Sequence, residues 1–112
     1  MTQDDIRSLA LSLPQAEEQP HFDRASFRVK GKIFATLPPG GAHVVLKLLP
    51  EIKESLKQTD PEAVIPLPGG WDRGGWTQIA IGSIDREKLA DLVRHAWRQV
   101  APKTLLRDGA EG

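Results

Sequence analysis

The residue types that carry acid–base and metal chemistry are sparse in this sequence. It contains no cysteine, and its three histidines stand far apart, at positions 21, 43 and 95. None lies in an H-x-x-x-H or H-E-x-x-H spacing, which would present two imidazoles to a metal ion from one helix face. No G-x-S-x-G segment offers a serine nucleophile. We therefore expect no catalytic residue, no metal and no cofactor. His21 is expected to pack against Phe22 near a sheet edge, and only a deep pocket enclosing a titratable group such as His21 would favour an enzyme.

Residues 66–76, PLPGGWDRGGW, combine four glycines, two prolines and two tryptophans. Glycine loops cradle phosphates when their amides converge at a helix N-terminus. This loop runs into a predicted strand and lacks a Gly-Lys-Ser/Thr ending, so nucleotide binding is not expected. As a hairpin tip it could present Arg73 to a nucleic-acid phosphate and Trp71 to an unpaired base. Alternatively, the glycines only allow a tight reversal that lays Trp71 and Trp76 along the backbone.

A second basic turn is predicted in FRVKGKIFATL, residues 27–37, whose alternation is typical of strands. Lys30-Gly31 fits a two-residue hairpin turn, with glycine supplying a positive φ. The expected cross-strand pairs are Val29 with Lys32, Arg28 with Ile33, and Phe27 with Phe34. On this register Phe27, Val29 and Phe34 face the core.

Basic side chains at the two turns form a candidate nucleic-acid site, provided that both turns point to the same side. The candidate residues are Arg24, Arg28, Lys30, Lys32, Trp71 and Arg73. Fifteen basic residues are balanced by fifteen acidic ones, and a sequence-independent DNA-binding protein usually carries a basic excess. Asp23 and Asp72 also lie directly beside two of the candidate arginines.

The elements that position these turns follow from periodicity and from proline. Residues 2–13 predict a helix capped by Thr2, and a second helix starts at Pro50 without a good cap. A third helix begins after Ser83 or Asp85 and carries an apolar stripe that includes Trp97. Strands are expected at 27–29, 32–37 and 43–48 before the second helix, and near 64–67 and 76–81 after it. The order α-β-β-β-α-β-β-α predicts an α+β two-layer domain, with an antiparallel sheet that has helices on one face. The whole chain, 1–112, is one domain with a flexible tail over about 104–112.

The sheet face away from the helices is a second candidate surface. The side chains predicted to point outward mix apolar and basic types: Arg28, Ile33, Ala35, His43, Val45 and Lys47. Such a face, if uncovered, would suit a partner protein or a second copy of the chain.

The chain resembles the MmcQ/YjbR family of small bacterial proteins. The resemblance lies in ALSLPQAEEQPHF, SFRVKGKIFATL, VVLKL, DPEAVIPLPGGWDRGGWTQI and LVRHAWRQVAPK, which cover almost the whole chain. It implies the same element order, a fold like that of secretion chaperones and somewhat like frataxin. It also implies a DNA-binding role, because family members are compared with a double-wing domain of a phage transcription factor. No established catalytic residues come with it.

The sequence thus predicts a non-enzymatic domain that binds DNA through two basic hairpin tips. The alternative is a protein-interaction or self-association module that uses the open sheet face. No apolar run approaches the ~20 residues that span a bilayer, and the N-terminus carries acids where a signal peptide carries positive charge. With the lack of cysteine, this predicts a cytoplasmic location.

Overall fold

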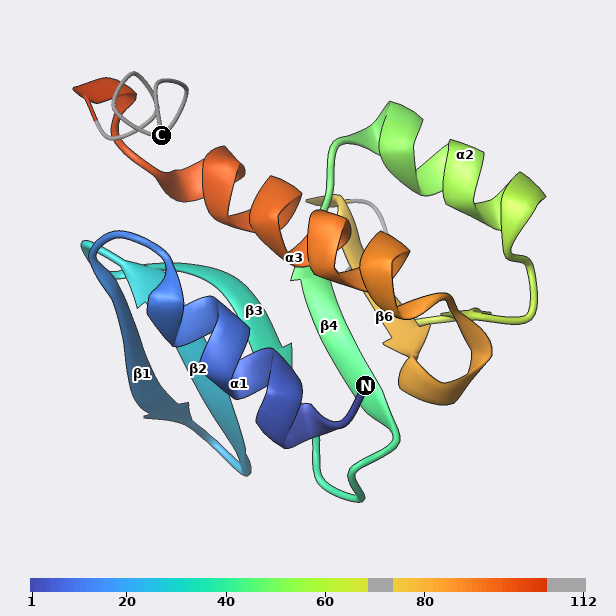
Figure 1. The fold of residues 1–112 in the computed structure, drawn as a ribbon, viewed down its shortest axis with the longest axis horizontal. Coiled ribbons are helices and arrows are strands. Elements are labelled where there is room, and N and C mark those ends of the chain that lie inside the picture. Colours follow the sequence, from blue (N-terminus) through green and yellow to red (C-terminus); the bar gives the residue numbers. More distant parts are fainter. Residues whose placement is uncertain (69–73, 105–112) are drawn as a thin grey trace.

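A computed structural model describes residues 1–68 and 74–104 (Figure 1). Its elements, in chain order, are α1 (Gln3–Ser12), β1 (Ala16–His21), β2 (Arg24–Val29), β3 (Lys32–Leu37), β4 (His43–Lys47), α2 (Pro50–Thr59), β5 (Val64–Ile65), β6 (Trp76–Ala80), a 3-10 turn (Ile81–Ser83) and α3 (Arg86–Val100). All neighbouring strands pair antiparallel in one six-stranded sheet of order β1-β2-β3-β4-β6-β5.

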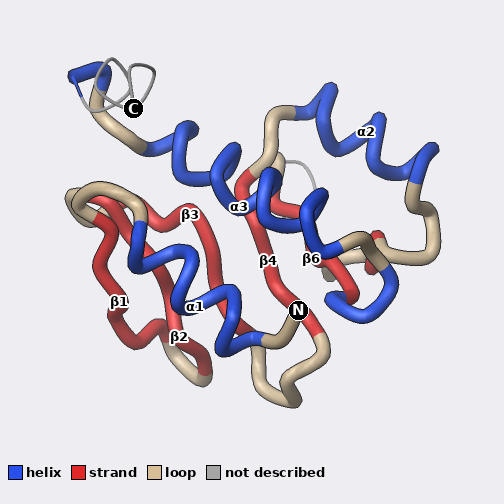
Figure 2. Tube along the Cα trace, viewed as in Figure 1, coloured by secondary structure: helices blue, strands red, loops and turns tan. Residues whose placement is uncertain are grey.

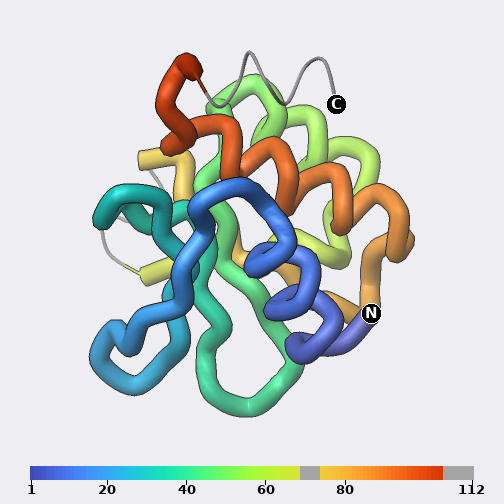
Figure 3. The backbone as a smooth tube through the Cα atoms, turned by 60° about the vertical axis from the view of Figure 1, so that its left-hand side comes forward, coloured from blue at the N-terminus to red at the C-terminus, as the bar shows by residue number. Residues whose placement is uncertain are grey.

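The helices form a second layer on one face of this sheet, as Figures 2 and 3 show. α1 and α3 pack on each other; α1 also contacts the edge strand β1, and α3 contacts β2, β3 and β4. α2 lies beside α3. Two hydrogen bonds hold α3 against the ends of α2. His95 accepts from the Leu49 N–H at 3.2 Å, and Lys88 donates to Asp60. The predicted α+β two-layer fold with helices on one face is therefore confirmed.

The helix ends follow the expected capping chemistry. Thr2 caps α1 in a capping box, since its hydroxyl accepts from the Asp5 N–H and the Asp5 carboxylate accepts from the Thr2 N–H. Of the two candidate caps for α3, Asp85 is the one used, and it accepts from Glu87 and Lys88 N–H groups. α2 begins at Pro50 with no side-chain cap, as expected.

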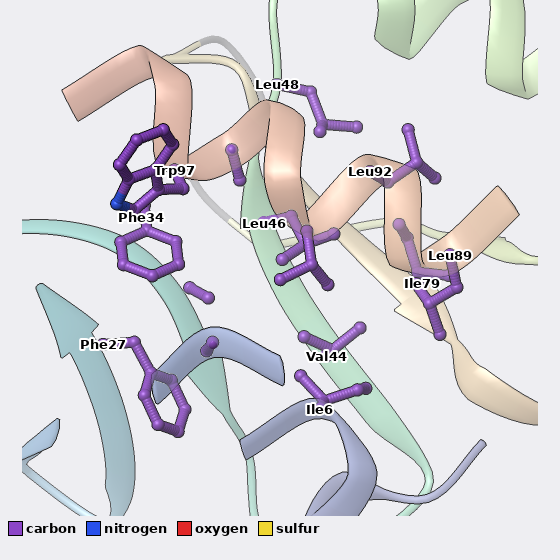
Figure 4. Close-up of a cluster of buried hydrophobic side chains, with 14 of the residues drawn as sticks. Ile6, Phe27, Phe34, Val44, Leu46, Leu48, Ile79, Leu89, Leu92 and Trp97 are labelled. Carbon is purple, nitrogen blue, oxygen red and sulfur yellow. The ribbon is translucent and has the colours of Figure 1, made fainter. Parts of the chain in front are cut away.

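The core lies between the two layers and is made by apolar side chains from the three helices and from β2, β3, β4 and β6 (Figure 4). Phe27, Phe34, Leu46 and Ile79 from the sheet are fully buried, and Trp97 of α3 is 5% exposed. Burying each such side chain contributes roughly 1.5–3 kcal/mol. The indole N–H of Trp97 donates to the Pro14 carbonyl at 3.0 Å, which fixes the ring over the end of α1. The core positions predicted for Phe27, Val29, Phe34 and Trp97 are confirmed.

The structure adds one strand, β1, to the three that were expected before α2. Its sequence, AEEQPH, shows no apolar alternation, and its four central residues are exposed. The strand forms because it pairs with β2 along its whole length, from Ala16 opposite Val29 to His21 opposite Arg24. A proline such as Pro20 is tolerated because β1 lies at the sheet edge.

A β-bulge corrects the predicted register of the β2–β3 hairpin. Val29 pairs with Lys32 and Arg28 with Ile33, as predicted, but Phe27 then pairs with Ala35 rather than with Phe34. The extra residue lets Phe34 and Ala35 both enter the core, where each is fully buried. The prediction that Ala35 faces outward was therefore wrong. Thr36, the next residue, faces away from the helices instead.

Within residues 1–68 and 74–104, none of the helices has the length and apolarity needed to cross a bilayer.

Candidate binding pocket on the open sheet face

The sheet face opposite the helices is hollowed by a pocket of about 480 Å³. It lies over the middle of the sheet, between the β1–β2 turn and the segment that follows β5. Its size falls within the range of ordinary ligand pockets, roughly 300–1,000 Å³. The pocket therefore marks the candidate functional site.

The floor of the pocket is one cross-strand row of three side chains. Thr36 of β3 pairs with Val45 of β4, and Val45 pairs with Gln78 of β6. Directly opposed residues on a shared face lie about 4.5–5.5 Å apart, so the three form a continuous strip. Thr36 is 7% exposed and Val45 5%. Among the described residues, neither the Thr36 hydroxyl nor the Gln78 side-chain amide has a hydrogen-bond partner.

The walls of the pocket are apolar. Ile33 lies on the sheet, Leu67 and Pro68 follow β5, and the half-buried Trp76 opens β6. The Lys47 ammonium lies 6.0 Å from the centroid of the Trp76 ring, a cation–π distance. Together, floor and walls suit a group with an apolar body and a polar end.

The rim is the β1–β2 turn, where Phe22 stands 95% exposed. Its φ of 58° is in the left-handed region, which costs a residue with a Cβ about 1–2 kcal/mol. The Phe22 ring meets the edge of the His21 ring at a centroid distance of 4.7 Å, so the expected contact between these two residues is present. An apolar ring held in solvent on a strained backbone is a feature that packing alone does not explain.

His21 is one of the residues that line this pocket, an arrangement that could favour an enzyme. Asp23, two residues further on, also lines the pocket, but its carboxylate accepts a hydrogen bond from Arg24 Nε at 3.2 Å and not from His21. No other described residue forms a hydrogen bond to the His21 ring that would orient it as a general base. The described residues also bring no three potential metal ligands together in one cluster.

The candidate nucleic-acid residues are only partly brought together. Lys30 and Lys32 are exposed at the β2–β3 turn. Arg28 instead lies across the sheet, where Nε donates to Ser26 Oγ at 3.0 Å and Nη2 to the Pro20 carbonyl at 3.5 Å. Arg24 is at the other end of β2, on the pocket rim. Trp71 and Arg73 lie outside the described residues, as does the predicted tail from residue 105 onward.

The sheet topology places the two connections of interest at the same end. Because all neighbouring strands are antiparallel, the β2–β3 turn lies at the same end of the strands as the end of β5 and the start of β6. Three strand spacings separate them, about 14 Å. Lys30 and Lys32 are therefore at the end of the sheet where β5 ends and β6 begins.

The candidate binding residues predicted from the sequence did not include Thr36, Gln78 or Phe22. Thr36 reaches the outer face only because of the bulge at Phe34, which no residue type in the hairpin announces. Gln78 did alternate with the buried Thr77 and Ile79, so its outward position was readable. Phe22 occurs in a turn that was not predicted.

The fold and the pocket define a small α+β domain with helices on one sheet face and, within residues 1–68 and 74–104, a pocket on the other. The chain belongs to the YjbR family, whose family model matches residues 11–99, and the predicted family is confirmed. Among solved structures, the chain is similar to Deinococcus radiodurans protein DR2400, whose crystal structure is described with the DUF419 family domain. The two are 26% identical, with a TM-score of 0.74, and the match covers 86% of this chain and 75% of that one. No curated protein matches the chain.

Proposed function

We propose that this chain is a non-enzymatic binding domain that holds a segment of a partner protein on the open face of its sheet. The observation that carries the proposal is the pocket on that face, with its apolar walls and its partnerless polar floor. Concave, mostly apolar pockets with a few polar groups are typical of binding sites.

The rim indicates a chain segment rather than a compact molecule. A compact ligand in the pocket would touch Phe22 at the rim but leave most of that side chain, which is 95% exposed, in water. A polypeptide that enters the pocket and continues over the β1–β2 turn would cover that ring as well. The exposed apolar ring then has a reason to be held beside the pocket.

A selection from a random peptide display library tests this function. We expect it to yield peptides that bind the wild-type domain and share an apolar or aromatic anchor. Ile33→Asp, which charges the pocket wall, and Phe22→Asp, which charges the rim, should each abolish binding while circular dichroism stays unchanged.

Leu11→Asp is the matched control, because Leu11 is also exposed, at 42%, but lies on α1 in the helical layer. It should leave peptide binding intact. If no peptide is enriched, or if the selected peptides bind all these variants equally, the proposal is refuted. Sedimentation of the free domain decides separately whether a second copy is the occupant.

A second candidate function, DNA binding, is favoured by one observation. Lys30 and Lys32 are exposed at the end of the sheet where β5 ends and β6 begins. If phosphates bind there, affinity for duplex or single-stranded DNA should fall steeply with salt. The substitutions Lys30→Ala and Arg73→Ala should each weaken it. An affinity that does not change with salt, or that both substitutions leave unchanged, refutes this function.

A further inference from the structure

The pocket floor is polar at a place where a purely apolar anchor would leave it unsatisfied. Thr36 is 7% exposed, and what remains accessible of it opens into the pocket. Any group seated on Val45 would shield the neighbouring Thr36 hydroxyl and Gln78 amide from water. A buried polar group without a hydrogen bond costs free energy, so the occupant is expected to provide one.

The two polar groups flank an apolar centre at a spacing that an aromatic side chain fits. Thr36 and Gln78 are two strands apart, with Val45 between them, so their Cα atoms are separated by about 10 Å. A ring lying on Val45 would point its edge toward one polar group and its own backbone toward the other. The volume of about 480 Å³ leaves room for main chain beside the ring.

We propose that the pocket receives a tyrosine side chain of the partner segment, whose hydroxyl is hydrogen-bonded by Thr36 or Gln78. This inference rests on the proposed function and adds the identity of the anchor. Tyrosine combines a large apolar body with one polar atom that needs a partner when buried. It is also enriched among the residues that dominate binding free energy at protein interfaces.

The contrast with phenylalanine gives the inference its test. A site built to hydrogen-bond a hydroxyl discriminates against the analogue that lacks it, because its own polar groups are then buried unpaired. Phenylalanine has the same ring as tyrosine without the hydroxyl. It should therefore enter this pocket less favourably.

The experiment is an NMR titration of the full chain with N-acetyl-tyrosinamide and, in parallel, N-acetyl-phenylalaninamide. The amide signals of Thr36, Val45 and Gln78 report binding in the pocket. We expect the tyrosine probe to bind about fivefold more tightly, the effect of one ordinary hydrogen bond. In the double variant Thr36→Val, Gln78→Leu the two probes should bind equally. Gln58→Leu, the same glutamine substitution on an exposed position of α2, should keep the wild-type preference.

The comparison on the wild-type chain needs no variant to fold and is sufficient to overturn the inference. Equal affinities of the two probes, with shifts at the pocket, would refute the hydrogen-bonded anchor and leave the binding face in place. Shifts elsewhere, or none for either probe, would refute the anchor outright, and the peptide selection would still decide the proposed function. A preference that persists in the double variant would also overturn it.

Discussion

The substitution Lys30→Asn should make the domain more stable while removing a charge from the candidate DNA surface. Lys30 and Gly31 have φ values of 50° and 82°, the pattern of a two-residue type I′ turn. Asparagine is strongly favoured at the first position of such a turn, and lysine is not. Lys30 is exposed, so its replacement removes no packing.

The expected gain follows from how often each residue adopts this backbone. Asparagine is several-fold enriched at positive φ relative to ordinary residues, and a fivefold preference corresponds to about 1 kcal/mol. For a chain of this length, about 1 kcal/mol raises the melting temperature by about 4 °C. Thermal and urea unfolding, followed by circular dichroism, measure both quantities.

Lys32→Asn is the matched control, since it removes the same charge two residues away from a strand position paired with Val29. Asparagine is disfavoured in strands, so this variant should gain nothing or lose slightly. If DNA binds at the turn, each variant should reduce the slope of log affinity against log salt by about one. Equal stability changes in the two variants, or a destabilised Lys30→Asn, would refute the turn geometry on which this reasoning rests.

Two further substitutions test the packing and the pH response. Gly75→Ala should destabilise the domain by about 1–3 kcal/mol more than Gly41→Ala. Both glycines have a positive φ, but only a Cβ at Gly75 would collide with the Leu48 carbonyl oxygen. Urea unfolding of the two variants measures the difference, and equal losses of stability would contradict the prediction. Burial lowers the pKa of His95 below its ordinary value of 6.5. As the pH falls below 6.5, the unfolded chain therefore binds the proton before the folded chain does, and the free energy of unfolding should fall. His95→Gln should remove this part of the dependence, and melts on either side of pH 6.5 that show no difference between variant and wild type would contradict it.

Much of the fold was predictable because it depends on sequence patterns between nearby residues. Apolar spacing located the helices, proline marked their ends, and Asp85 and Thr2 were recognisable caps. Lys30-Gly31 fixed the β2–β3 turn and its first two residue pairs. These features depend on neighbours within a few residues, which a sequence displays directly.

The features that were missed depend on contacts between distant segments. β1 is a polar edge strand that forms through its pairing with β2, and its own residues carry no strand signal. The bulge at Phe34 allows Phe34 and Ala35 both to be buried in the core, which depends on contacts with other elements. It turns Ala35 inward and Thr36 outward, which reverses the expected faces.

The candidate site was predictable only in outline for the same reason. The open sheet face and Val45 on it followed from alternation. The pocket itself requires the β1–β2 turn and residues 67–68 to flank the same face, although more than 40 positions separate them in the sequence, and no motif signals that arrangement. The sequence identifies the basic residues but does not show which of them lie close together. Arg24 and Lys30, for example, lie at opposite ends of β2.

The central claim is that the uncovered sheet face binds a partner segment. Its most direct test is an amide chemical-shift map of the labelled domain with a peptide from the library selection. The account predicts that the perturbed signals cluster on Phe22, Thr36, Val45 and Gln78, with the solvent-facing sides of α1 and α3 unchanged. Perturbations confined to the helical layer, or to the Lys30–Lys32 turn alone, would contradict it.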